Sequence, residues 1–249
     1  MLMYPKILPN AIFIADAHES DRRDDFYHFL LAIHSKQIKT SQLFLMGDMF
    51  DLLVGKVTYG VKKYKKYLEL LEKIAQDIEV YYFEGNHDFS LSNLFLHVKI
   101  IPIQKQPMLF ELEATKSLCA LSHGDKYGDF IHNFYTFLIR NKGLLKILNF
   151  LDERIGFGIS KKIEKDLLQK DICRKIEGFK SKIATKLKLY SSQNLSYILE
   201  GHYHQNKEYK FGNLNYINFS SFACNQSYFI VEFFNGVKFT QKKLRGFDV

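Results

Sequence analysis

Residues 42–51 read Gln-Leu-Phe-Leu-Met-Gly-Asp-Met-Phe-Asp. The apolar run is short and stops at a glycine, which predicts a buried strand that ends just before Asp48. A glycine at a strand end lets the backbone approach its neighbours closely. Ligands of open α/β sheets gather outside the carboxyl ends of the strands. This stretch therefore predicts a buried sheet with a site at its edge.

Four more apolar runs of this kind are each followed by a polar cluster, at residues 11–15, 79–83, 117–121 and 196–199. Helical patterns separate the first three strands, at residues 21–36 and 61–75. This alternation predicts an α/β fold with right-handed crossovers. The clusters after the five runs are Asp16-Ala17-His18, Gly47-Asp48-Met49-Phe50-Asp51, Gly85-Asn86-His87-Asp88, Ser122-His123-Gly124-Asp125 and Gly201-His202-Tyr203-His204.

The clusters offer carboxylate, imidazole and amide oxygen as ligands, and no thiolate. This set fits a pair of hard or borderline divalent ions better than a structural zinc. Each residue alone has a structural explanation, such as a helix cap for Asp48 or a turn for Asn86. Their shared position after strands favours one site that binds two ions, most simply Mn²⁺, with Mg²⁺, Fe or Zn²⁺ also compatible. The predicted ligands are Asp16, His18, Asp48, Asn86, His123, His202 and His204.

Three residues in the clusters are predicted to assist rather than to bind metal. His87 adjoins Asn86, and we expect it beside a substrate phosphate, where it stabilises charge or protonates the leaving oxygen. Asp88 is expected to hold the His87 ring and fix its tautomer. Asp51 is expected to support its own loop.

The distribution of charge predicts an anionic partner. The chain has 249 residues and a net charge of +8, and residues 126–199 hold 15 Lys and Arg against 7 Asp and Glu (15 − 7 = 8). The whole excess therefore lies between the fourth and fifth clusters. Residues 126–192 contain no proline and have helical spacing, which predicts a helical insertion, or lid, on a single domain that spans residues 1–249.

The remaining segments predict ordinary structure. Residues 215–219, 228–234 and 237–240 alternate like strands, and Asn235-Gly236 indicates a hairpin, so we expect an antiparallel meander that closes a second sheet. The cysteines, Cys119, Cys173 and Cys224, are widely spaced and are expected to be reduced thiols in a cytosolic protein. No signal peptide or membrane-spanning stretch is indicated, and the oligomeric state is not predicted.

The five motifs, in the order D-x-H, G-D-x-x-D, G-N-H-D, a His before Gly, and G-H-x-H, resemble those of the calcineurin-like metallophosphoesterase superfamily. The resemblance implies a four-layer α/β/β/α sandwich that hydrolyses phosphoesters with two metal ions. It also implies how the ligands divide. One ion would be held by Asp16, His18 and His204, the other by Asn86, His123 and His202, and Asp48 would bridge the two.

Within that superfamily, residues 47–55 and 86–89 and the motif His123-Gly-Asp125 look like those of bacterial UDP-2,3-diacylglucosamine pyrophosphatases of lipid A synthesis. Their best-known branch has Arg where this chain has His87. This likeness implies a lipid-linked nucleotide substrate, cleaved to UMP and 2,3-diacylglucosamine 1-phosphate at the cytoplasmic face of the inner membrane. The alternatives are another metallophosphoesterase, such as a nuclease or cyclic-nucleotide phosphodiesterase, and a non-catalytic binding module.

The helical insertion is both apolar and basic, as a lid for such a lipid would need to be. Phe134, Phe137 and Leu138 could line an acyl groove. Lys161, Lys162 and Lys165 could meet phosphate or sugar, and the same surface could bind an anionic bilayer. Alternatively, the insertion packs its apolar face on the core and solvates its lysines. Its aromatics are mostly Phe at helical core spacing, which argues against a nucleic-acid partner.

Overall fold

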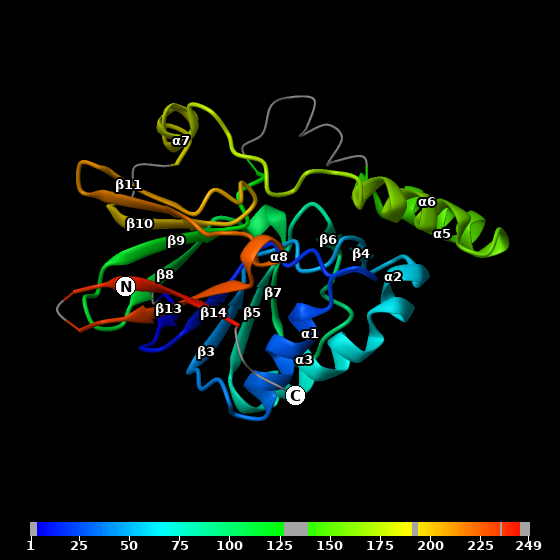
Figure 1. Cartoon of the computed structure of the whole chain (residues 1–249), viewed down its shortest axis with the longest axis horizontal. Helices are drawn as coiled ribbons and strands as arrows, with labels where there is room; N and C mark the ends of the chain where they lie inside the picture. Colours follow the sequence, from blue (N-terminus) through cyan, green and yellow to red (C-terminus); the bar gives the residue numbers. More distant parts are fainter. Residues whose placement is uncertain (1–3, 127–138, 191–193, 235, 245–249) are drawn as a thin grey trace.

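The computed structural model describes residues 4–126, 139–190, 194–234 and 236–244. Two six-stranded sheets lie face to face between helices, as expected for a four-layer α/β/β/α sandwich (Figure 1). The first sheet has the strand order β14 (Lys238–Lys243), β13 (Ser227–Glu232), β2 (Ile12–Ile14), β3 (Gln42–Leu45), β5 (Glu79–Phe83), β7 (Lys99–Ile101). The second has the order β1 (Lys6–Ile7), β8 (Met108–Leu112), β9 (Leu118–Ser122), β10 (Leu195–Glu200), β12 (Leu214–Asn218), β11 (Lys207–Phe211).

Alternation along each strand builds the layers, because successive side chains point to opposite faces. On β2, Ile12 and Ile14 pack against the helices that cover the first sheet, whereas Phe13 points into the core between the sheets. There the Phe13 ring stacks on Phe44 with centroids 4.6 Å apart. The helices over the first sheet are α1 (Asp25–His34) and α3 (Lys65–Asp77), and α2 (Thr58–Lys63) precedes α3.

The strands that carry the motifs run parallel within each sheet. β2 pairs with β3, and β3 with β5, so their carboxyl ends share one edge. In the second sheet β10 pairs in parallel with β9 and β12. The small parallel pair β4 (Leu53–Val54) and β6 (Asp88–Phe89) joins the loops that follow β3 and β5. The five motifs therefore meet along one edge of the sandwich.

The prediction of a meander after His204 was wrong. β11 and β12 belong to the second sheet, where Tyr197 lies opposite Asn215 in a parallel register. The short helix α8 (Phe222–Asn225) then carries the chain to the first sheet, where Phe229 pairs with Phe13. The hairpin of β13 and β14 is antiparallel as predicted. Local alternation predicts a strand but does not say which sheet receives it.

In the described part of residues 126–192, every regular element is a helix. α5 (Lys142–Arg154) and α6 (Gly158–Leu167) form a pair that extends away from the body (Figure 1). α7 (Phe179–Leu187) instead packs on the outer face of the second sheet, where Phe179 and Ile183 contact Ile198. α7 is therefore the fourth layer of the sandwich. A 3-10 turn, η1 (Ile103–Lys105), follows β7.

Candidate metal centre

The seven predicted ligands lie together at the edge where the strands end. His204 Nε2 is 3.0 Å from Asp16 Oδ1. His123 Nε2 is 3.4 Å from both Asp48 Oδ2 and Asn86 Oδ1. Two sets of ligand atoms, each within 4.8 Å of one another, could hold metal ions. One set is Asp16, His18 and His204, and the other is Asp48, His123 and His202.

Five of these ligands have a left-handed backbone. Non-glycine residues rarely adopt a positive φ, which costs about 1–3 kcal/mol each and is found mostly at functional sites. The tight turns of the motif loops hold them in this conformation and direct their side chains to a common point. The φ values are 53° for Asp16, 45° for His18, 53° for Asp48, 63° for His202 and 57° for His204.

The motif glycines are required by close approach of the ligands. A Cβ on Gly85 would lie 2.1 Å from Asp48 Oδ1, and one on Gly201 would lie 2.6 Å from Asp16 Oδ2. Any larger residue would displace a carboxylate. The glycines therefore allow loops from different strands to pack against the ligands of their neighbours.

Three of the histidine ligands are held by a hydrogen bond at Nδ1, which leaves Nε2 facing the centre. His18 Nδ1 is 3.1 Å from Asp51 Oδ1, His123 Nδ1 is 2.9 Å from the Met46 carbonyl, and His204 Nδ1 meets the Ile172 carbonyl. Such partners orient metal-binding imidazoles. His18 Nε2 is buried and has no hydrogen-bond partner among the described residues. A buried nitrogen without a partner is costly, so this ring fits a site that a metal ion completes.

Asp51 supports its loop, as expected. Its second oxygen accepts a hydrogen bond of 2.6 Å from Arg23 Nη2, while the first faces His18. The Arg23 Nε also donates to the His18 carbonyl at 2.8 Å. These contacts fasten the first and second motif loops together. Asp51 nevertheless lies in a third close set with His18 and His87.

Burial and charge set the protonation of the centre. Burial alone would raise the pKa of Asp48, but the nearby His123 and His87 outweigh it and hold that pKa well below its usual range. Burial opposes the charged form of His123, yet Asp48 raises its pKa well above the usual value. Burial and the His123 charge lower the pKa of His202 strongly. The lowered pKa favours the neutral imidazole of His202, which is the form that binds metal.

Asp88 does not hold the His87 ring, so that prediction was wrong. Its fully buried carboxylate accepts hydrogen bonds from the backbone N–H of Asp48 at 2.9 Å and Met49 at 2.6 Å, and from Tyr82 Oη at 2.5 Å. Burial and the charge of Asp48 raise its pKa to about 7. Adjacent residues of an extended chain point to opposite sides, so Asp88 faces inward while His87 faces the centre. Asp88 fastens the second motif loop to the third.

Two hollows open beside the centre and share Asp51, Asn86, His87, Leu167 and Lys170. The first, the polar hollow, has a volume of about 340 Å³ and is also lined by His18, Asp48, His202, His204, Asp171, Ile172, Arg174, Ile176, Lys182 and Tyr203. The second, the apolar hollow, has a volume of about 360 Å³. It lies against the α5–α6 pair and is lined by Leu52, Val54, Val57, Phe89, Ile139, Leu144, Leu145, Leu148, Asn149, Asp152, Ile159, Ser160 and Ile163.

The substrate residues predicted from the sequence are placed differently. Lys161, Lys162 and Lys165 are exposed on α6 and line neither hollow, because that face of the helix points to solvent. The basic side chains of the polar hollow are Lys170, Arg174 and Lys182, which lie beyond α6 or on α7. No spacing signal marks them in the sequence. The predicted acyl contacts Phe134, Phe137 and Leu138 lie outside the described residues.

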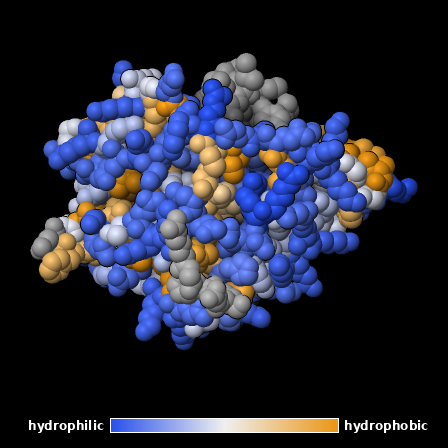
Figure 2. Space-filling view, viewed as in Figure 1, coloured by the Kyte–Doolittle hydropathy of each residue, from blue (hydrophilic) through white to orange (hydrophobic). Residues whose placement is uncertain are grey.

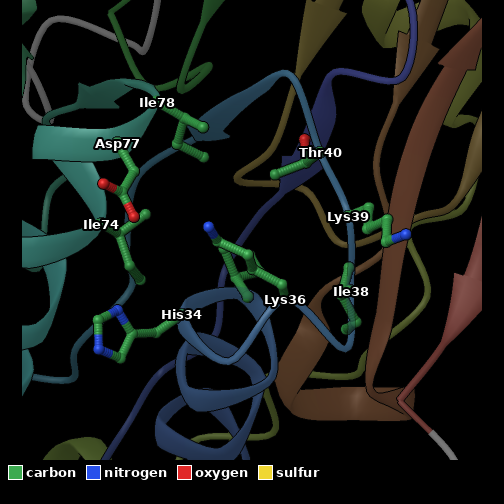
Figure 3. Close-up of a pocket in the computed structure, with 9 residues that line it drawn as sticks. His34, Lys36, Ile38, Lys39, Thr40, Ile74, Asp77 and Ile78 are labelled. Carbon is green, nitrogen blue, oxygen red and sulfur yellow. The ribbon is translucent and has the colours of Figure 1, made fainter.

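A third hollow, of about 190 Å³, lies between the C-terminal ends of α1 and α3 (Figure 3). Its residues include Thr40, two residues before β3, and Ile78, which directly precedes β5. It therefore lies at the edge of the sheet opposite the motifs. Ile38 and Ile74 line its apolar wall, and it takes no part in the centre.

The prediction of three reduced cysteines was also wrong. Cys173 and Cys224 form a disulfide with Cα atoms 5.8 Å apart, and Cys119 is a free, buried thiol. The two partners are 51 residues apart in the chain. Wide spacing in sequence gives no sign that the fold brings two thiols together.

Comparison with known proteins assigns the family. Residues 10–206 match the family model described as calcineurin-like phosphoesterase. The chain belongs to that family. This phosphoesterase is therefore a hydrolase of the metal-dependent type, and its clustered carboxylates and imidazoles are candidate ligands for divalent ions. Among the described helices, none is both long and apolar enough to cross a bilayer.

Several curated relatives of this phosphoesterase share one name, UDP-2,3-diacylglucosamine hydrolase. The UDP-2,3-diacylglucosamine hydrolase of Haemophilus ducreyi is 26% identical over 61% of this chain and 66% of that protein. The enzyme of that name from Coxiella burnetii strain Dugway is 22% identical over 79% of this chain and 81% of its own. A solved archaeal phosphodiesterase covers 94% of this chain and 99% of its own, at 11% identity and a TM-score of 0.45.

Proposed function

We propose that this phosphoesterase hydrolyses the pyrophosphate of UDP-2,3-diacylglucosamine to UMP and 2,3-diacylglucosamine 1-phosphate. The observation that carries the proposal is the pair of hollows that meet at Asn86 and His87. A diacylated sugar nucleotide has an anionic end and an apolar end on either side of the scissile bond. The polar hollow suits the first and the apolar hollow suits the second. The relatives named for this activity support the same substrate.

We infer that two divalent ions, most simply Mn²⁺, occupy the centre, with Asp48 between them. Asp16, His18 and His204 would hold one ion, and Asn86, His123 and His202 the other. The close sets of ligand atoms support this division. Bound ions of this kind polarise a phosphoryl oxygen and lower the pKa of water. Asp, Asn and His ligands suit Mn²⁺ but do not exclude Mg²⁺, Fe or Zn²⁺.

His87 lies on the wall that both hollows share, which supports its assignment beside the phosphoryl group. Its Nδ1 is 2.9 Å from the Asp51 carbonyl. A carbonyl only accepts hydrogen bonds, so Nδ1 carries the proton and the neutral ring offers Nε2 as an acceptor. We therefore assign His87 to orienting water or substrate through Nε2 rather than to protonating the leaving oxygen.

The substrate diphosphate, at its uridine end, would accept charge-assisted hydrogen bonds from the basic side chains of the polar hollow. These are Arg174, Lys170 and Lys182. Tyr203 lies beside them, and the Lys182 ammonium is 4.8 Å from the centre of its ring. These groups come from the segment after α6, from α7 and from the fifth motif, and all of them line the polar hollow.

We also propose that the α5–α6 pair binds the cytoplasmic face of an anionic inner membrane. Ile147, Phe150, Leu151 and Ile155 are about half exposed or more, at 60%, 54%, 48% and 59%. Figure 2 shows apolar side chains gathered at the tip of this pair. The same two helices also carry exposed lysines, including Lys142, Lys146 and Lys161. Apolar residues flanked by cations are typical of helices that lie on anionic bilayers.

The experiment is to incubate the protein with UDP-2,3-diacylglucosamine in detergent micelles and Mn²⁺, and to measure UMP release. We expect release that stops when a chelator removes the metal. The same preparation should be offered a cyclic nucleotide, single-stranded DNA and a soluble nitrophenyl diester. Rapid cleavage of a nucleic acid or a cyclic nucleotide, with none of the lipid, would replace this proposal with that other activity.

A further inference from the structure

The disulfide joins two segments that hold opposite sides of the metal centre. Cys173 lies between α6 and α7, and Cys224 lies in α8, which follows β12. We use the name strap for residues 172–176. Cys173 and its neighbour Arg174 are exposed, whereas Cys224 is half-buried. Neither cysteine is itself a predicted metal ligand.

The strap supports the fifth motif. The Ile172 carbonyl accepts the hydrogen bond from His204 Nδ1. The next contacts are with Gln205, which is buried: its Nε2 donates to the Arg174 carbonyl at 3.0 Å, and its Oε1 accepts from the Ile176 N–H at 2.9 Å. The strap therefore sets the orientation of the His204 ring and also forms one wall of the polar hollow.

The other end of the disulfide supports the first motif. Ser221, just before α8, donates its hydroxyl to the Asp16 carbonyl at 2.7 Å, and the Ala223 N–H donates to the same carbonyl at 3.2 Å. The Phe222 N–H donates to the Ala15 carbonyl at 2.9 Å. These bonds hold Asp16 in its left-handed conformation, with φ at 53°.

These contacts form a closed circuit. It runs from Asp16 Oδ1 across 3.0 Å to His204 Nε2, on to the Ile172 carbonyl, through the disulfide to α8, and back to Asp16. Among the described residues, the disulfide is the one covalent cross-link between the strap and α8. His123 lies outside this circuit, because its Nδ1 is held by the Met46 carbonyl at 2.9 Å.

We propose that the Cys173–Cys224 disulfide positions the subsite of Asp16, His18 and His204, and that reduction by a dithiol weakens metal binding at that subsite alone. The inference rests on the proposed assignment of the metal ligands. In the reaction, the dithiol passes two electrons and two protons to the disulfide, the S–S bond breaks, and the dithiol becomes a disulfide. Exposure of Cys173 lets a dithiol reach the bond. Disulfides in cytosolic proteins are often of this redox-sensitive kind.

The test is calorimetric titration of the whole chain with Mn²⁺. Three forms are compared: oxidised protein, protein reduced with dithiothreitol and desalted without air, and Cys173→Ser. We expect two ions to bind the oxidised protein. In the other two forms, one ion should bind at least about 10-fold more weakly, and the affinity for the second ion should not change. A loss of this size is typical when a group that orients a metal ligand is removed. Cys224→Ser should behave in the same way, and the Cys173→Ser/Cys224→Ser double variant should be no worse.

Cys119→Ala is the matched control, because Cys119 is buried and unpaired. It should bind both ions as the wild type does and respond equally to the dithiol. Unchanged affinity for both ions in the reduced and Cys173→Ser proteins would overturn the proposal, even if the melting temperature fell, because the disulfide would then be only a structural link. Fewer than two ions bound to the oxidised wild type would overturn the metal assignment and this proposal with it.

Discussion

The loops that follow the strands and the α5–α6 pair meet at Asn86 and His87, and they are held in different ways. In the loops, Asp16, Asp48 and His123 are almost fully buried, and hydrogen bonds from other loops hold them in place. The α5–α6 pair projects from the body, and several of its apolar side chains are exposed (Figures 1 and 2). The buried loops carry the candidate chemistry, and the projecting pair borders the place for a substrate.

Polar contacts with α2 attach the pair to the body, beside the apolar packing of Leu145 on Val54 and Phe89. Glu164 is buried on α6 and accepts hydrogen bonds from Tyr59 Oη at 2.7 Å and Lys63 Nζ at 2.6 Å. On α5, Asn149 Oδ1 accepts from the Thr58 N–H at 2.8 Å. Such contacts are directional, so they specify where the helices dock, whereas apolar packing alone would leave their register less defined.

The largest expected effect is that of Asp48→Asn. It keeps the shape of the side chain but removes the charge at the middle of the centre. We therefore expect kcat to fall by at least about 100-fold. Loss of a residue that only orients a metal ligand typically costs roughly 10–100-fold. The loss should be equal for a diacylated substrate and a soluble diester, because both use the same centre. Full turnover by a folded Asp48→Asn protein, checked by circular dichroism, would contradict the two-metal assignment.

The second effect is on stability and concerns the attachment of the pair. Glu164→Ala leaves the Tyr59 and Lys63 groups without their buried acceptor, which should cost about 2 kcal/mol. Hydrogen exchange should become faster in α5 and α6 but not in the strands. Asp166→Ala is the matched control, because Asp166 is exposed on the same helix. Equal exchange in both variants would mean that Glu164 does not fasten the pair.

The third effect concerns only the apolar hollow. Leu148 lines it, and Ile147 on the same helix does not. In detergent micelles, Leu148→Asp should lower kcat/KM for a diacylated substrate by about 10-fold, the loss expected when a charge replaces about 1–2 kcal/mol of apolar contact. Activity on a soluble diester should not change. If Ile147→Asp caused the same loss in micelles, the hollow would not be the acyl site.

The smallest effect separates the lysines on the solvent face of α6 from those that line the polar hollow. Lys161→Gln should change kcat/KM less than about 2-fold, since Lys161 lines neither hollow and an exposed charge without a partner contributes little. Lys170→Gln, the matched variant inside both hollows, should lower it several-fold for a diphosphate substrate. Steady-state kinetics with that substrate would distinguish them, because Lys170 lines both hollows and Lys161 lines neither. A larger effect at Lys161 would restore the role first predicted for it.

The strands and the candidate ligands could be predicted from the sequence because the signals for both are local. Runs such as residues 42–46 and 79–83 became β3 and β5 within a residue or two, and the polar cluster after each run lies at the predicted edge. The gathering of Asp16, His123 and His204 followed from parallel pairing, which aligns the carboxyl ends of strands. The helices α1 and α3 followed from apolar spacing in the same way.

What was mispredicted depends on distant parts of the chain. Only the assembled sheets determine that β12 and β13 belong to different sheets, since strand periodicity is the same in both. The direction of Asp88 depends on backbone donors contributed by the second motif loop, and the pairing of Cys173 with Cys224 depends on where α8 lies. The sequence by itself determined the strands and the ligand types, through periodicity and residue chemistry. The tertiary structure decided which partners those residues meet, because contacts between segments far apart in the chain arise only when the layers pack.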